Sequence, residues 1–221
     1  MTPAALAVGL GFAALGAGAE RLASVWPADE ASHRPPGLRT GLLAAAAAIA
    51  GGAMALRSTL PAWALGVQLV ILAILVLLTA TDLEQRRLPH LLLDPLIVVA
   101  VLFVPFNPTV DWRSALLGAG AGVAFMGLLG LLVRGGVAFG DLLLVAPLGL
   151  ILGWPAVFVA MFVAGILSAV VSLGLLLSRR AGLKSYIPFA PFLVAGAVIT
   201  LLRDPELLGS VVAALIGLRQ T

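Results

Sequence analysis

The chain has 221 residues, of which 62% are apolar and only 10% are charged, whereas about 25% of the residues in an average soluble domain are charged. Thirteen basic and ten acidic side chains cannot cover the surface of a soluble fold of this size, and the mean hydropathy is +1.16. We therefore predict one polytopic membrane domain over residues 1–221. This excludes a secreted enzyme, a nucleic-acid-binding protein and a disordered tail.

The chain contains no cysteine and two histidines, His33 and His90. The absence of cysteine excludes disulfides, thiolate metal sites, iron–sulfur clusters and a cysteine nucleophile. The two histidines are too few and too far apart to indicate a histidine-rich metal centre. We therefore expect neither a metal nor another cofactor.

Apolar runs separated by short polar segments predict an all-α bundle of eight transmembrane helices, since about 20 apolar residues cross a bilayer. The first run has no basic region before it and no convincing cleavage site, so we expect it to be retained. A last segment, 206–218, is short and is either an interfacial helix or a ninth span. The predicted helices cover 3–19, 40–56, 61–80, 90–105, 113–133, 141–153, 155–177 and 187–202.

The distribution of lysine and arginine predicts the orientation, because basic residues gather in cytoplasmic loops. With the N-terminus outside, the inner loops would be 20–39, 81–89, 134–140 and 178–186. These loops hold nine of the thirteen basic residues and the outer loops hold three, with Arg219 left unassigned. The nine are Arg21, Arg34, Arg39, Arg86, Arg87, Arg134, Arg179, Arg180 and Lys184.

Two carboxylates stand next to predicted spans, where an ionisable side chain suggests function. Asp82 follows one apolar run and Asp141 opens another, with the spans 90–105 and 113–133 between them. An even number of crossings returns the chain to the same side, so both aspartates belong at the cytoplasmic end. Paired carboxyls at short distance share a proton, and such a pair can activate a water and protonate a leaving nitrogen.

Structural roles are open for each of these acids. Asp82 could form an ion pair with Arg86 one turn later, and Asp141 could cap the N-terminus of its helix. Glu84 lies in a very polar stretch and is expected to be solvated. Asp94 is either a third active-site group or, as we favour, a polar packing residue.

Three segments, taken together, resemble the motifs of the type IV prepilin peptidases. Segment 81–90 contains Asp82 and then Leu-Pro-His, with Pro89 in the position of the family's aliphatic-Pro step. Segment 139–149 contains Gly140 and Asp141 and resembles the family's Gly-x-Gly-Asp motif. Segment 187–193 resembles the Pro-Phe-Gly-Pro-Phe signature and supplies Pro188, Phe189 and Pro191. The motif-bearing part covers about residues 61–202.

The chain departs from the family pattern at several positions. Ala138 replaces the first glycine of the second motif, Leu143 replaces a lysine, and Ala190 replaces a glycine. Loss of a glycine matters where the backbone needs a positive φ. Bifunctional family members also carry a cysteine-bearing cytoplasmic insertion associated with N-methylation, whereas the corresponding loop 20–39 is short and lacks cysteine.

The resemblance implies an aspartic endopeptidase of the inner (plasma) membrane that removes basic leaders from prepilin-like or pseudopilin-like precursors at the cytoplasmic face. Asp82 and Asp141 would be the catalytic pair, and N-methylation is not expected. Three alternatives remain: a catalytically impaired pilus-assembly scaffold of the same fold, a small proton-coupled transporter, and a related protease that cuts archaellin-like or signal-peptide substrates.

Overall fold

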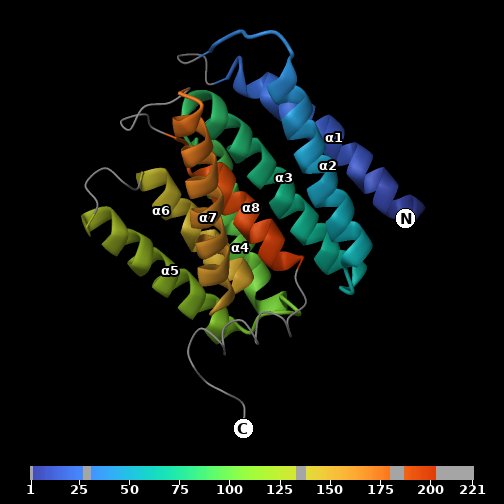
Figure 1. The fold of residues 1–221 in the computed structure, drawn as a ribbon. Helices are drawn as coiled ribbons and strands as arrows, with labels where there is room; N and C mark the ends of the chain where they lie inside the picture. Colours follow the sequence, from blue (N-terminus) through green and yellow to red (C-terminus); the bar gives the residue numbers. More distant parts are fainter. Residues whose placement is uncertain (1, 27–30, 133–137, 180–186, 203–221) are drawn as a thin grey trace.

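The structure is a computed structural model that describes residues 2–26, 31–132, 138–179 and 187–202. These ranges are all-helical, with eight α-helices joined by short connections (Figure 1). The helices are α1 (Pro3–Ala23), α2 (Leu38–Arg57), α3 (Ala62–Gln85), α4 (His90–Phe103), α5 (Trp112–Leu132), α6 (Phe139–Leu152), α7 (Ala156–Leu177) and α8 (Ala190–Leu201). A short 3₁₀ helix, η2 (Val104–Phe106), follows α4.

Each of the eight predicted ranges overlaps one of these helices, so the all-α prediction is confirmed for the described residues. Five helices, α1, α2, α3, α5 and α7, are long and apolar enough to cross a membrane. The other three, α4, α6 and α8, are shorter. The eight predicted spans therefore correspond to eight helices, five of which have full spanning length. The proposed ninth segment, 206–218, lies outside the described residues.

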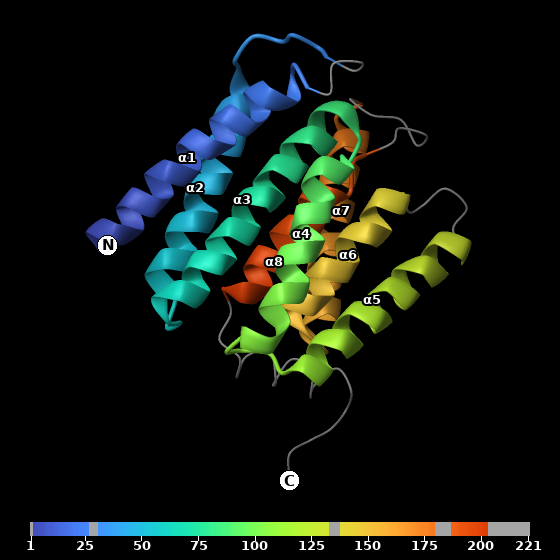
Figure 2. The same cartoon turned by 180° about the vertical axis from the view of Figure 1, so that it is seen from behind.

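The helices form an inner and an outer set (Figures 1 and 2). Helix α3 packs against α1, α2, α4 and α8, while α6 packs against α4, α5, α7 and α8. The inner set is therefore α3, α4, α6 and α8, of which α4 leaves one face exposed, with Leu91, Val98, Val101 and Leu102 more than half accessible (Figure 2). The α1–α2 hairpin covers one flank of α3, and α5 and α7 lie on the far side.

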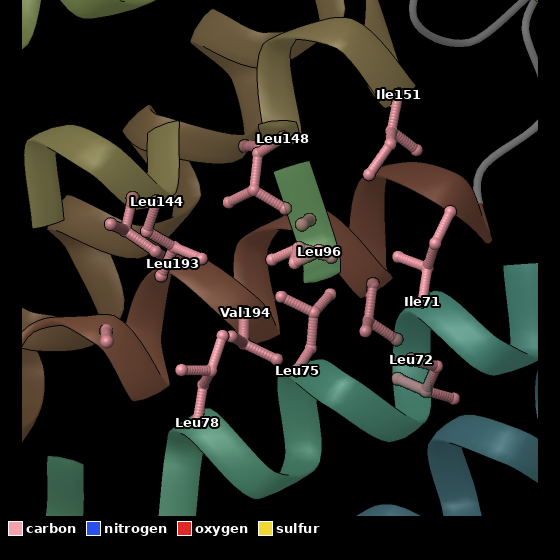
Figure 3. Packing of buried hydrophobic residues seen from close by; sticks show 14 of the residues in the cluster. Ile71, Leu72, Leu75, Leu78, Leu96, Leu144, Leu148, Ile151, Leu193 and Val194 are labelled. Carbon is pink, nitrogen blue, oxygen red and sulfur yellow. The ribbon is translucent and has the colours of Figure 1, made fainter. Parts of the chain in front are cut away.

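The apolar core lies among the four inner helices (Figure 3). Leu75 and Leu78 of α3 meet Leu96 of α4, Leu144 of α6 and Leu193 of α8, and all five are nearly inaccessible. The outer helices instead expose large apolar side chains, among them Leu10, Leu131, Phe162, Leu173 and Leu177. So much exposed apolar surface is unfavourable in water and suits contact with lipid.

Glycine allows two of the inner contacts to be very close. A Cβ atom added to Gly196 of α8 would lie 2.2 Å from the backbone oxygen of Ala160 in α7. One added to Gly149 of α6 would lie 2.5 Å from the Cα of Ala119 in α5. Small residues of this kind let helix backbones approach each other in a membrane. These contacts fix the positions of α6 and α8, which carry two of the three motifs.

The alternating direction of the helices gathers the motifs at one end of the bundle. The C-terminal ends of α1, α3, α5 and α7 lie at this end together with the starts of α2, α4, α6 and α8 (Figure 1). The described parts of the four predicted inner loops therefore share one end. Arg134, Arg180 and Lys184 lie outside the described residues.

Candidate active site

Asp82 lies in the last turn of α3, which runs five residues beyond the predicted end at residue 80. Arg86 ends the helix by adopting a left-handed conformation, with φ of 55°. Its backbone N–H donates to the carbonyl of Asp82 at 2.9 Å. The αL termination turns the chain towards Pro89, which precedes α4.

The carboxylate of Asp82 is buried and holds the start of α8. The side chain belongs to a residue only 4% exposed, and its Oδ2 accepts a hydrogen bond of 3.2 Å from the backbone N–H of Ala190. Ala190 is the first residue of α8, where backbone N–H groups have no partner within the helix. Pro188, Phe189 and Pro191 surround this donor, so the third motif presents a backbone donor to the aspartate of the first.

Asp141 lies in the first turn of α6 and is also only 4% exposed. The capping position is Ala138, so the interpretation of Asp141 as the N-cap is wrong; Asp141 is three residues further on. The backbone N–H of Asp141 donates to the carbonyl of Ala138 at 3.1 Å. An acidic side chain in the first turn of a helix interacts favourably with the helix dipole.

The two aspartates are both buried at the same end of the bundle. Each is only 4% exposed, and the negative charge of Asp141 acts on Asp82. Like charges held together in a buried site disfavour a state in which both are ionised. The arrangement can therefore store one proton between two carboxyl groups, which is the requirement for combined general-acid and general-base chemistry.

Gly140 allows the first and second motifs to touch. A Cβ added to Gly140 would lie 3.1 Å from Cδ1 and 3.3 Å from Cβ of Leu88. Leu88 directly precedes Pro89, so the start of α6 packs against the connection between α3 and α4. Pro89 and Gly140 thus lie where the first and second motifs meet.

A partly buried polar network reaches α3 at Glu84, two residues after Asp82, and was not predicted from the sequence. The Nη2 atom of Arg34 lies 2.6 Å from Oε1 of Glu20 and 2.8 Å from Oε2 of Glu84. Thr40 donates to Glu20 at 2.8 Å, and Ser32 donates to Glu84 at 2.5 Å. The hydrogen bond with Glu20 raises the pKa of the Arg34 guanidinium above its usual value.

The structure corrects the sequence-based expectations for two acidic residues, Glu84 and Asp94. Glu84 was expected to be solvated, but its side chain is only 8% exposed because Arg34 and Ser32 cover it. Asp94 is not a packing residue: its side chain is 66% exposed and pairs with His90 at 3.2 Å. A polar contact between side chains four residues apart on an exposed helix face is a common surface feature.

The departures from the family motifs are accommodated locally. Ala138 has φ of −76° and ψ of 148°, an extended conformation that any residue adopts. A glycine is therefore not required there by backbone geometry. Leu143 packs against the apolar core, where the family pattern has a cation. Within the described ranges, no three His, Cys, Asp or Glu side chains gather in a way that could hold a metal ion.

Residues 69–173 match the model of the type IV leader peptidase family. This match runs from α3 through most of α7 and includes both aspartates. This chain belongs to the type IV prepilin peptidase family. The resemblance inferred from the three motifs is confirmed.

Individual relatives support the same assignment. A prepilin leader peptidase/N-methyltransferase of Burkholderia pseudomallei (strain K96243) is 34% identical over 173 residues, covering 76% of this chain and 55% of that protein. The protein of the same name from Bacillus subtilis (strain 168) is 27% identical over 155 residues, covering 67% and 60%. The chain thus spans between half and three fifths of the length of these relatives. No solved structure matches significantly.

Proposed function

We propose that this protein is an aspartic endopeptidase that removes the leader peptides of type IV prepilin-like or pseudopilin-like membrane precursors. The observation that supports this most directly is the juxtaposition of two buried carboxylates, Asp82 from α3 and Asp141 from α6, at one end of the bundle. The names of the family and of its relatives point to the same substrates.

The chemistry needs one carboxylate and one carboxylic acid. The ionised aspartate removes a proton from a water molecule, whose oxygen attacks the scissile carbonyl carbon. The protonated aspartate then gives its proton to the leaving amide nitrogen as the carbon–nitrogen bond breaks. The water supplies the hydroxyl of the new carboxyl end, and its other proton stays on the aspartate that removed it. That proton replaces the one given to the amide nitrogen, so each turnover leaves the pair with one shared proton.

The basic loops support placing the site at the cytoplasmic face of the inner membrane, with the N-terminus outside. Arg39, Arg86 and Arg179 are described residues of the predicted inner loops and all belong to the end of the bundle that holds the aspartates. A precursor whose leader is cytoplasmic and whose apolar helix lies in the bilayer would present its cleavage site at this level.

Co-expression with candidate prepilins tests the activity. Wild-type protein should remove the leader, while Asp82→Asn and Asp141→Asn should each lower cleavage at least 100-fold at equal membrane abundance. Asparagine keeps the size and hydrogen bonding of the side chain but has no exchangeable carboxyl proton. Cleavage by either variant at near the wild-type rate contradicts the catalytic pair. Solute flux into liposomes without cleavage would favour the transporter, and assembly that tolerates both variants would favour the scaffold.

The proposed activity is cleavage without methylation. S-adenosylmethionine is a sizeable polar cofactor, and the connection between α1 and α2 is too short to enclose it with a core of its own. The described part of this connection is also engaged with α3 through Ser32 and Arg34. Mass spectrometry of a pilin processed only by this protein should give an unmodified N-terminus. A gain of one methyl group that depends on this protein contradicts the proposal.

A further inference from the structure

The α1–α2 hairpin lies outside the region that matches the family model, yet its polar end is attached to the last turn of α3. Helix α1 packs along α3, and the hairpin lines one flank of the helix that carries Asp82. Two separate sets of contacts hold this flank. One passes through Arg34 and Glu84, and the other through Gln85.

Arg34 joins two carboxylates that belong to different helices. Its guanidinium binds Glu20 of α1 and Glu84 of α3 at 2.6 and 2.8 Å. The Glu20 side chain is only 7% exposed and that of Glu84 only 8% exposed. Both contacts are made by one nitrogen, Nη2, whose two coplanar N–H groups can each serve one of the two nearly buried carboxylates. Arg34 therefore fixes the distance between the end of α1 and the end of α3.

Gln85 provides the second attachment. Its Nε2 donates to the carbonyl of Ala23 at 2.6 Å and to that of Trp26 at 2.9 Å. The carbonyl of Ala23 belongs to the last turn of α1, where carbonyl groups have no donor within the helix, and that of Trp26 belongs to the turn that follows. The side chain of Gln85 is buried. The α3 turn that begins at Asp82 is thus held by α1 on one flank, while Asp82 itself holds α8.

We propose that Arg34 is a positioning residue for Asp82, which acts by locking the last turn of α3 against the α1–α2 hairpin. The inference rests on the proposed peptidase function for its kinetic consequences. Among the described residues, the Arg34 side chain pairs with Glu20 and Glu84, so its effect on Asp82 passes through Glu84, two residues later in α3. The hairpin is then part of the catalytic framework.

Steady-state cleavage of a prepilin by the purified full-length protein tests this role. Arg34→Gln should lower kcat at least 10-fold and leave KM within about twofold, because the substrate-binding surface is unchanged while the aspartate is displaced. Arg34→Lys should give an intermediate kcat, since an ammonium group keeps the charge but lacks the two coplanar N–H donors of Nη2 and lies on a more flexible side chain. An increase in KM at unchanged kcat would overturn the proposal and would indicate that this cluster binds the leader.

Arg39→Gln is the matched control. Arg39 also approaches Glu84, but at 3.5 Å and with a side chain 66% exposed, so its replacement should change neither constant by more than twofold. Ser32→Ala is a milder variant for the case in which Arg34→Gln does not fold, because it removes only the hydrogen bond to Glu84. Ser32→Ala should lower kcat severalfold and leave KM unchanged. If kcat is unchanged in both Ser32→Ala and Arg34→Lys, the proposal is overturned.

Cross-linking separates failure of this inference from failure of the proposed function. The chain has no native cysteine, so Asp82→Cys and Ala190→Cys form the sole thiol pair, at positions joined by a hydrogen bond. Disulfide formation in membranes should be at least threefold slower when Arg34→Gln is added and unchanged when Arg39→Gln is added. An equal rate in the Arg34→Gln background overturns the positioning role, even if no prepilin is cleaved by the wild-type protein.

Discussion

The carboxylate of Asp82 accepts a hydrogen bond from the backbone N–H of Ala190, although 108 residues separate the two positions. This bond joins the last turn of α3 to the first turn of α8. It uses a backbone donor that the helix itself leaves free, and such donors favour a negatively charged partner. The third motif therefore contributes a main-chain atom to the candidate site.

Ala190 should tolerate a smaller side chain but not a larger one. Ala190→Gly keeps the N–H donor, and cleavage should stay within about threefold of wild type. Ala190→Leu places three extra carbon atoms at a fully buried position, and overpacking of this kind costs about 1–3 kcal/mol. We expect at least a 10-fold loss of cleavage measured at equal membrane abundance. Equal activity of the two variants would show that α8 does not need this close approach.

Gly140 and Leu88 should behave as a coupled pair. Gly140→Val should impair cleavage because its side chain meets Leu88, whose Cδ1 is 3.1 Å from the added Cβ. Leu88→Ala removes the obstructing atoms, so the double variant should recover part of the activity lost in Gly140→Val. A double-mutant cycle measures this coupling, which we expect to be about 1 kcal/mol in apparent activation free energy. Strict additivity would contradict the contact.

Gly196→Ala should destabilise the bundle strongly. The new Cβ would lie 2.2 Å from the backbone oxygen of Ala160, and a backbone atom cannot rotate away. We expect a loss of at least about 2 kcal/mol, an overpacking cost, visible as a lower midpoint of thermal inactivation in detergent. Gly165→Ala in α7 is the control, because no atom lies within 4 Å of its added Cβ. A similar fall for both variants would exclude the helix contact as the cause.

Single cysteines test the proposed orientation. Arg39→Cys and Thr109→Cys lie at exposed positions at opposite ends of the bundle, and the chain contributes no competing thiol. In intact cells an impermeant thiol reagent should modify Thr109→Cys and leave Arg39→Cys unmodified until the membrane is opened. The reverse labelling pattern would place Asp82 and Asp141 at the outer face.

The sequence predicted the helices well because apolar runs of spanning length have few alternatives in lipid. It ended α3 too early, at residue 80, because the polar residues Asp82, Glu84 and Gln85 interrupt the hydropathy pattern. These residues stay helical and buried because α8, Arg34 and the end of α1 supply their partners. A hydropathy scale includes the free-energy cost of burying a polar side chain, but not the hydrogen bond or ion pair that compensates for this cost.

The candidate site was predictable only in part. The count of spans between Asp82 and Asp141 placed them at one end of the bundle, and the motifs pointed to both. The bond from Ala190 and the bridge through Arg34 join segments that no local pattern links. The sequence feature that could have indicated the Arg34 bridge is Glu84, because an acidic residue at the end of a membrane helix suggests a nearby cation.

The short helices at the site have a consequence for the depth of the two aspartates in the membrane. Helices α6 and α8 contain 14 and 12 residues, so at about 1.5 Å per residue they are about 21 and 18 Å long. The hydrocarbon core of a bilayer is about 30 Å thick. Because α6 and α8 are largely buried among the other helices, lipid does not adapt to their length. Their polar starts can instead lie below the level of the headgroups, with water reaching them from that end. In that arrangement the depth of Asp82 and Asp141 depends on bilayer thickness, and a thicker bilayer would place the pair further from the aqueous phase.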